Sequence, residues 1–282
     1  MSVGETQLSQ IKYQRQALEM AAHTFWWDRA NLTPLQIRSY WSAADDAISA
    51  WDATERPPLE ARHSACGAII LKVMLTLGQP RERARQLRYE LVNPPIEDDL
   101  ERLCLLKRDH VTFLILSPDS GRIEDAKPLG FLLPAITPDY RKEPPGATAR
   151  LGRPRQACLA LPDLTNLGDQ LLRWFRKQER QANPDRTVLG VHPETADASV
   201  NQFFKTYDAR FGAGLRLSES AFARWLAVTC EVQTGDQSLA WMVTADLNRR
   251  NESRLHYTQH MACRLLDAYA GAIRRLRVIC QP

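Results

Sequence analysis

The segment Val111-Thr-Phe-Leu-Ile-Leu116 is a short and almost wholly apolar run, and similar runs follow it at 129–133 and 157–161. Pro, Gly and Asp residues separate these runs from one another. Short apolar runs bounded by turn-forming residues are typical of β-strands. Together with an earlier run at 103–106, they predict one small antiparallel sheet between about residues 100 and 162.

The sequence on both sides of this sheet shows the apolar spacing of helices. Thr33-Pro34 is a helix start, because a capping residue is followed by proline at the first helical position. Before the sheet, helices are predicted from Pro34 to about Trp51, at 59–77, and from Pro80 to about Tyr89. Beyond the sheet, helices are predicted at about 164–181, 196–210, 219–232, 238–248 and 255–278.

The order of elements is therefore helices, one small sheet and helices again, which predicts a mostly helical α+β fold. A Rossmann or barrel fold would alternate strands and helices along the whole chain. The sequence also lacks the G-x-x-x-x-G-K-[ST] and G-x-G-x-x-G motifs that bind nucleotide phosphates. Nucleotide-dependent chemistry consequently has no support in the sequence.

The composition is that of a globular protein, with 282 residues of which 44% are hydrophobic and 25% charged. The longest apolar stretches are far shorter than the roughly 20 residues that a bilayer span requires, and the first residues lack a secretion signal. We therefore expect a cytoplasmic protein, associated with the nucleoid if it is bacterial, without a membrane partner. The six cysteines form no C-x-x-C pair, which argues against a zinc ribbon and favours buried reduced thiols.

Charge is distributed unevenly along the chain, whose formal net charge is +4. Residues 1–140 carry 16 Lys and Arg against 19 Asp and Glu, whereas residues 141–282 carry 21 against 14. A basic half suits a polyanionic partner, and nucleic acid is the commonest. A solvated basic face without a partner explains the charge equally well.

A Pro- and Gly-rich insertion at about 137–155 is predicted to be an exposed loop. Between residues 141 and 155 only Glu143 opposes the cations, which therefore cannot easily neutralise one another. We expect five of these cations to bind a DNA backbone: Arg141, Lys142, Arg150, Arg153 and Arg155.

Three segments carry residues that suit chemistry on a phosphodiester. The first is a glycine-containing turn followed by an arginine-bearing segment, at 75–89, which includes Arg81. In the second, a predicted helix places Arg224 among apolar neighbours. Tyr257, at the head of the last predicted helix, belongs to the third.

In their order and context these segments resemble the catalytic domain of the tyrosine recombinases, the phage-integrase family. That family has a T-G-x-R turn, a lysine on a β-hairpin, an H-x-x-R box and a nucleophilic tyrosine near the C-terminus. The resemblance covers roughly residues 59–276. It implies an N-terminal helical segment at 1–55 and a recombinase-like catalytic domain at 56–282 that carries the basic insertion.

The resemblance implies that Arg81, Arg224 and Tyr257 converge on one DNA phosphate. Planar guanidinium groups match the phosphate oxygens and stabilise the charge that develops when a phenol attacks. The product is a 3′-phosphotyrosine that preserves the bond energy for rejoining, so no metal and no other cofactor is implied. The implied partners are double-stranded DNA of a mobile element and, on that DNA, further copies of the chain or a partner recombinase.

Two positions depart from the family pattern. Ala221 lies three residues before Arg224, where the family has histidine, and Asn248 lies nine residues before Tyr257, where it has histidine or tryptophan. Lys127 and Lys142 are candidates for the hairpin lysine, but neither lies in a K-T-G context, and Arg150 or Arg153 occupies the place just before the end of the strand at Leu161-Pro162. Without these acid–base groups, proton transfer lacks help usually worth about 10² to 10⁴ in rate. We therefore expect DNA binding with slow cleavage or none, which is a derived role at recombination sites.

An alternative function comes from a different class of protein. The chain would then be a non-catalytic helical protein-interaction module whose basic C-terminal half contacts an acidic partner. Salt dependence separates the two functions, because DNA binding through phosphate contacts weakens steeply with salt, whereas a mainly apolar protein interface does not.

Overall fold

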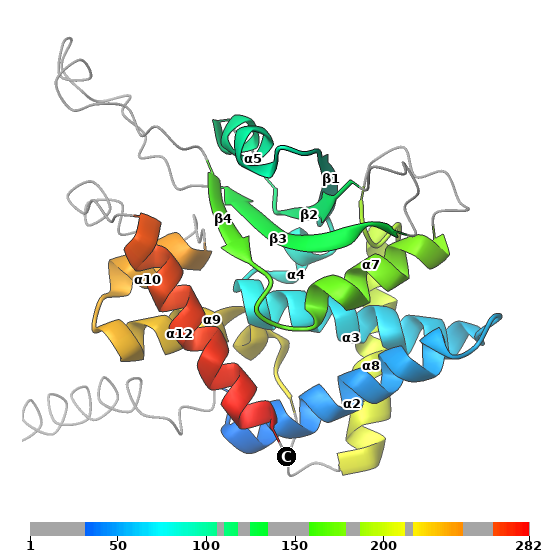
Figure 1. Cartoon of the computed structure of the whole chain (residues 1–282). Coiled ribbons are helices and arrows are strands. Elements are labelled where there is room, and N and C mark those ends of the chain that lie inside the picture. The colour runs from blue at the N-terminus through cyan, green and yellow to red at the C-terminus, as the bar shows by residue number, and fades with distance from the viewer. Residues whose placement is uncertain are drawn as a thin grey trace, which may run out of the picture.

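The computed structural model describes residues 32–105, 110–117, 125–134, 158–178, 187–211, 217–244 and 262–281. These residues form a mostly helical α+β fold with one small four-stranded sheet, shown in Figure 1. The predicted fold class is confirmed at this level.

Helix α3 (Leu59–Leu77) lies at the centre of the helical layer. Its residues from Ser64 to Leu77 are all buried, which confirms the prediction of a buried helix here. Helices α2 (Pro34–Asp52) and α8 (Pro193–Phe211) pack against it, as Figure 1 shows.

The predicted start of α2 is confirmed by a reciprocal capping box. Thr33 Oγ1 accepts a hydrogen bond from the Gln36 backbone N–H over 3.2 Å, and Gln36 Oε1 accepts one from the Thr33 N–H over 2.9 Å. Pro34 occupies the first helical position, where its missing N–H costs nothing. The chain therefore enters the helix with its terminal donors satisfied.

Four further helices correspond to those predicted after the sheet, namely α7 (Leu167–Gln178), α9 (Glu219–Thr234), α10 (Gln237–Thr244) and α12 (Ala262–Cys280). Helix α9 packs against α3, α10 and α12. Helix α12 returns to α2, where Arg38 Nε donates a hydrogen bond to the Ile279 carbonyl oxygen over 3.0 Å. None of the described helices combines the length and the apolar character needed to cross a bilayer.

The sheet contains strands in the order β1 (Arg88–Val92), β2 (Thr112–Leu116), β3 (Lys127–Pro134) and β4 (Cys158–Pro162). Strands β2, β3 and β4 pair antiparallel, but β1 pairs with β2 in parallel. The predicted antiparallel sheet is therefore wrong at this edge, and the sheet is mixed. The parallel pair needs a crossover connection, and α5 (Ile96–Leu105) lies between β1 and β2 in the chain.

Two local predictions before β2 are wrong. Residues 103–105 of the strand predicted at 103–106 belong to α5 instead, where Leu103 packs with Leu100 and Ile96, at helical spacing, against the sheet. The helix predicted from Pro80 ends after one turn, since α4 spans only Arg81–Ala84. The chain then pairs with β2, where the Arg88 N–H donates to the Val111 carbonyl oxygen over 3.1 Å. A contact distant in sequence thus outweighs local helical spacing.

The two faces of the sheet belong to different hydrophobic clusters. Phe113 and Ile115 of β2 belong to the large core that the main helices share, whereas Leu114 belongs to a smaller cluster under α5. Alternate residues of a strand point to opposite faces. The sheet is therefore covered on both sides, by α5 on one face and by the helical layer on the other (Figure 1).

Candidate functional site

A buried turn after α3 sets the position of Arg81. Gly78 ends α3 with φ at 63°, and a Cβ at this position would lie 2.4 Å from Thr244 Cγ2. Gln79 is wholly buried, and its side-chain nitrogen donates to the carbonyl oxygens of Leu77 and Thr244, over 2.9 and 2.5 Å. The turn is thus held against the end of α10, and Arg81 follows it at the start of α4.

Arg81 connects three helices through ion pairs. Its Nε lies 3.2 Å from Glu219 Oε1, on the first residue of α9, and 3.4 Å from Asp197 Oδ1 on α8. Arg85 follows one helical turn later, and its Nη1 lies 3.3 Å from the same oxygen of Asp197. Two arginines that lead into the sheet are therefore held next to the starts of α8 and α9.

Arg224 folds back along α9 towards the same turn. Its Nε donates to the Ser220 carbonyl oxygen over 3.1 Å, and its Nη2 donates to Ser220 Oγ over 3.2 Å. Ser220 follows directly after Glu219, which contacts Arg81. Arg81 and Arg224, which the recombinase resemblance assigns to one site, thus both reach the first turn of α9.

The remaining residues of the predicted site are placed as follows. Ala221, which the resemblance matches to the family's acid–base histidine, is buried in the core. Tyr257 and Asn248 lie outside the described residues. The same holds for the five cations of the basic insertion, Arg141, Lys142, Arg150, Arg153 and Arg155.

The charges around Arg81 nearly balance. Burial raises the pKa of the Glu219 carboxyl, Arg81 opposes that rise, and Glu82 and Asp197 add to it. Arg81 is thus paired with the carboxylates of Asp197 and Glu219, and Arg85 is paired with that of Asp197. A phosphate that binds these arginines must displace carboxylate oxygens first.

The pairing of these two arginines is incomplete. Arg81 Nε and Arg85 Nε are buried, and neither has a hydrogen-bond partner among the described residues. The Glu219 oxygen close to Arg81 Nε is within ion-pair distance without the alignment of a hydrogen bond. Buried donors without partners are uncommon in native proteins, so these two N–H groups are an exception in this fold.

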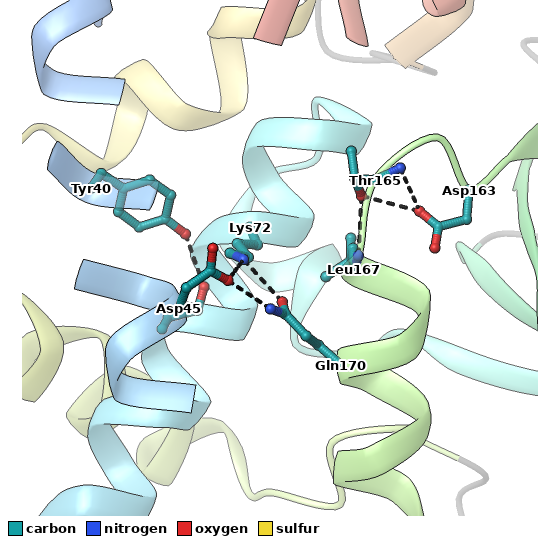
Figure 2. Close-up of polar contacts among 8 residues, drawn as sticks. Tyr40, Asp45, Lys72, Asp163, Thr165, Leu167 and Gln170 are labelled. Carbon is teal, nitrogen blue, oxygen red and sulfur yellow. Dashed lines mark hydrogen bonds and ion pairs between the residues drawn. The ribbon is translucent and has the colours of Figure 1, made fainter. Parts of the chain in front are cut away.

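A buried charge network lies apart from this cluster, and we did not predict it from the sequence (Figure 2). Lys72 of α3 is wholly buried, and its Nζ donates to Asp45 Oδ1 over 2.6 Å and to Gln170 Oε1 over 3.0 Å. The Gln170 amide also donates to Asp45 Oδ1, over 2.7 Å. The signal in the sequence was one lysine inside the apolar run 69–74, because a buried charge requires a partner.

This network holds three helices together. It joins α2, α3 and α7, and Lys72 Nζ also lies 4.1 Å from the centroid of the Trp41 ring. Burial lowers the pKa of Lys72, and Asp45 opposes that effect. Beside the network, a cavity of about 590 Å³ is lined by residues that include Trp41, Asp163 and Cys280. Asp163 accepts hydrogen bonds from Thr165, as Figure 2 shows. It also accepts one from the Gly168 N–H and so caps the start of α7.

The prediction of buried thiols is confirmed for four cysteines only. Cys66, Cys104, Cys158 and Cys230 are buried, whereas Cys280 is partly buried and Cys263 is exposed on α12. None of the six cysteines, all of which lie in the described ranges, forms a disulfide bond. Within the described ranges, no group of three or more His, Cys, Asp or Glu side chains is arranged to hold a metal ion.

Comparisons of the chain with protein-family models, with curated proteins and with solved structures find no match. The structure itself defines the class of the protein, which is a mostly helical α+β fold with a mixed four-stranded sheet. Arg81 and Arg85 contact Asp197 of α8, Arg81 also contacts Glu219 of α9, and Arg224 contacts Ser220 of α9.

Proposed function

We propose that this chain is a DNA-binding protein of the tyrosine-recombinase type, which binds DNA phosphates near the first turn of α9 and cleaves DNA slowly or not at all. The observation that supports this function is the position of Arg81 and Arg224. The two residues are far apart in sequence, yet Arg81 contacts Glu219 and Arg224 contacts Ser220, which are neighbours in the chain.

The chemistry of this turn suits a phosphate in two respects. Guanidinium groups are permanently charged and present their donors in a planar fork that matches phosphate oxygens. The N-terminus of a helix as long as α9 also carries a partial positive charge. Both features favour an anion at the position where Arg81 and Arg224 meet α9.

Slow cleavage follows from two further features of the same turn. Ala221 offers no group that could transfer a proton, and its side chain is 1% exposed in the core. Asp197 and Glu219 place negative charge beside Arg81, which opposes the charge that develops on a phosphate during attack. Both features impair the chemical step more than they impair binding.

The test measures the binding of mixed-sequence DNA duplexes by fluorescence anisotropy at several salt concentrations. We expect Arg224→Ala and Arg81→Ala each to weaken binding about 10- to 100-fold, since a hydrogen bond to a charged group contributes about 1.5–3 kcal/mol. Each variant should also lower the slope of log affinity against log salt by about 0.9. Arg102→Ala is the control, because Arg102 is exposed on α5 and pairs with Asp99.

Three outcomes would contradict this function. Absence of DNA binding would favour the protein-interaction module. Equal effects of Arg102→Ala and Arg224→Ala would remove the site from the first turn of α9. Rapid trapping of a covalent tyrosine adduct on nicked duplexes, lost in Tyr257→Phe, would show that the chain is an efficient recombinase.

A further inference from the structure

One carboxylate oxygen is shared by two arginines in the cluster. Asp197 Oδ1 lies 3.4 Å from Arg81 Nε and 3.3 Å from Arg85 Nη1. The side chains of Arg81 and Arg85 are 24% and 19% exposed, so water reaches both only in part. Two half-buried guanidinium groups that converge on one anionic oxygen form the arrangement that arginine pairs make around a phosphate oxygen.

The carboxylates lie farther from these arginines than in the shortest ion pairs of the described chain, although the Lys177–Asp52 contact, at 3.4 Å, is as long. The Lys72–Asp45 and Arg210–Asp46 pairs are each 2.6 Å long, whereas the contacts of Arg81 and Arg85 range from 3.2 to 3.4 Å. Charge-assisted hydrogen bonds between nitrogen and a carboxylate are normally about 2.7–2.9 Å long. In the cluster, Arg85 Nη1 donates a long hydrogen bond of 3.3 Å to Asp197 Oδ1, and Arg81 Nε has no hydrogen bond to either carboxylate.

The arginines also retain donors that these carboxylates do not use. Arg81 Nε and Arg85 Nε are buried and have no hydrogen-bond partner in the described part of the chain. A phosphodiester has two non-bridging oxygens, each able to accept more than one hydrogen bond. It could satisfy both Nε groups, which Asp197 and Glu219 leave unsatisfied.

The two carboxylates are partly exposed to solvent and can turn away from the arginines while they remain hydrated. The Asp197 side chain is 43% exposed, and the Glu219 side chain is 31% exposed. A rotation of either side chain towards solvent would release the arginines while the carboxylate gains hydration. A competing anion can therefore displace the carboxylates of Asp197 and Glu219.

We propose, on the basis of the function proposed above, that Arg81 and Arg85 form a phosphate site for the DNA backbone and that Asp197 and Glu219 occupy it as an autoinhibitory contact. In the absence of DNA the two carboxylates neutralise the arginines. When a backbone phosphate approaches, it displaces them and binds both guanidinium groups. The chain consequently binds DNA more weakly than its arginines alone would allow.

The test compares neutral variants of similar shape. Asp197→Asn removes the shared carboxylate, and Asp46→Asn is the matched control, because Asp46 pairs with Arg210 on α8 and its loss changes the net charge equally. We expect Asp197→Asn to bind mixed-sequence duplexes about tenfold more tightly than Asp46→Asn does, since a like charge beside a binding anion opposes it. Glu219→Gln should show a gain in the same direction.

A second change identifies the arginine responsible. Adding Arg85→Ala to Asp197→Asn should abolish the gain, because Arg85 is one of the two ligands that Asp197 releases. Thermal melting of each variant verifies that it is folded.

Different results would refute the autoinhibitory contact and the DNA-binding function. If the unmodified chain binds DNA through Arg224 but Asp197→Asn gains nothing over Asp46→Asn, the autoinhibitory contact is refuted and the DNA-binding function stands. A gain that persists without Arg85 would also refute the two-arginine site. If neither the unmodified chain nor any variant binds duplexes, both proposals are refuted together.

Discussion

Lys72 Nζ lies 2.6 Å from Asp45 Oδ1, and this ion pair joins α3 to α2 at a point where the lysine side chain is wholly buried. Arg210 Nη1 lies at the same distance from Asp46 Oδ2, but those two side chains are 51% and 60% exposed. The chain therefore contains two ion pairs of equal length in contrasting surroundings. Their energies should differ, because burial removes the screening by water that weakens an exposed pair.

We expect Lys72→Ala to lower the free energy of unfolding by about 3 kcal/mol, near the lower end of the range for breaking a buried pair, because Asp45 keeps some contact with water. Arg210→Ala should cost about 0–1 kcal/mol. Urea denaturation followed by circular dichroism measures both values. Equal costs for the two variants would show that the Lys72 network contributes no more than a surface pair.

The turn before Arg81 offers a second comparison between two sites of similar backbone conformation. Gly78 and Gly235 have φ angles of 63° and 68°, but only at Gly78 would a Cβ meet a neighbour, Thr244 Cγ2 at 2.4 Å. We expect Gly235→Ala to cost about 1–2 kcal/mol through backbone strain. Gly78→Ala should cost about 1–3 kcal/mol more, because it also overpacks the contact with α10.

The same urea measurement verifies the Gly78 prediction, and DNA binding adds a second readout. Because the turn positions Arg81, a folded Gly78→Ala protein should also bind duplexes more weakly than Gly235→Ala. Similar stabilities of the two variants would mean that the chain relaxes around the added methyl group.

Local sequence signals predicted much of the architecture. The Thr33-Pro34 start and the run Val111–Leu116 are specified by neighbouring residues, and both elements form where they were expected. The strand that begins at Arg88 was missed because it depends on pairing with β2, more than twenty residues away in the chain. Non-local pairing leaves little trace in the spacing of a short segment.

The candidate site was predictable only in part. Arg81 and Arg224 were selected from their sequence context, and both reach the first turn of α9. Their carboxylate partners were not predicted. Asp197 and Glu219 lie on separate helices, and neither stands in a sequence pattern that indicates an arginine partner. Charge compensation between distant segments becomes visible only after folding.

The buried thiols should lower the stability of the fold at alkaline pH. Burial raises the pKa of Cys230 from 9.0 to about 12. The folded chain then holds this proton more tightly than the unfolded chain does, so stability is lost as the pH rises above 9.0 and towards about 12. The buried thiol of Cys66 and the partly buried thiol of Cys280 act in the same direction. Lys72 opposes them, because its lowered pKa makes the folded state gain stability as pH rises.

We expect Cys230→Ala to reduce the loss of unfolding free energy between about pH 8 and about pH 10 by about 1.4 kcal/mol, the contribution of one thiol over that interval. Cys263→Ala is the control, because this side chain is exposed. Urea denaturation at several pH values gives the two slopes. Identical slopes for Cys230→Ala and Cys263→Ala would show that the Cys230 thiol does not contribute to the alkaline loss.

Protonation of Glu219 should change the affinity for DNA at the acidic end of the pH range. Burial raises the pKa of Glu219, with Arg81 opposing that rise and with Glu82 and Asp197 adding to it. Glu219 therefore takes up a proton, as pH falls, before an exposed glutamate would. In its neutral form it no longer competes with a phosphate for Arg81, so affinity for DNA should increase.

We expect mixed-sequence duplexes to bind the unmodified chain up to about tenfold more tightly at mildly acidic pH than at neutral pH, a change of about 1.4 kcal/mol. Glu219→Gln should bind more tightly at neutral pH already and should lose this part of the pH dependence. The quantity to compare is the difference between the pH profiles of the two proteins, measured by fluorescence anisotropy at constant ionic strength. Parallel profiles would show that Glu219 keeps its charge through the range and does not control access to Arg81.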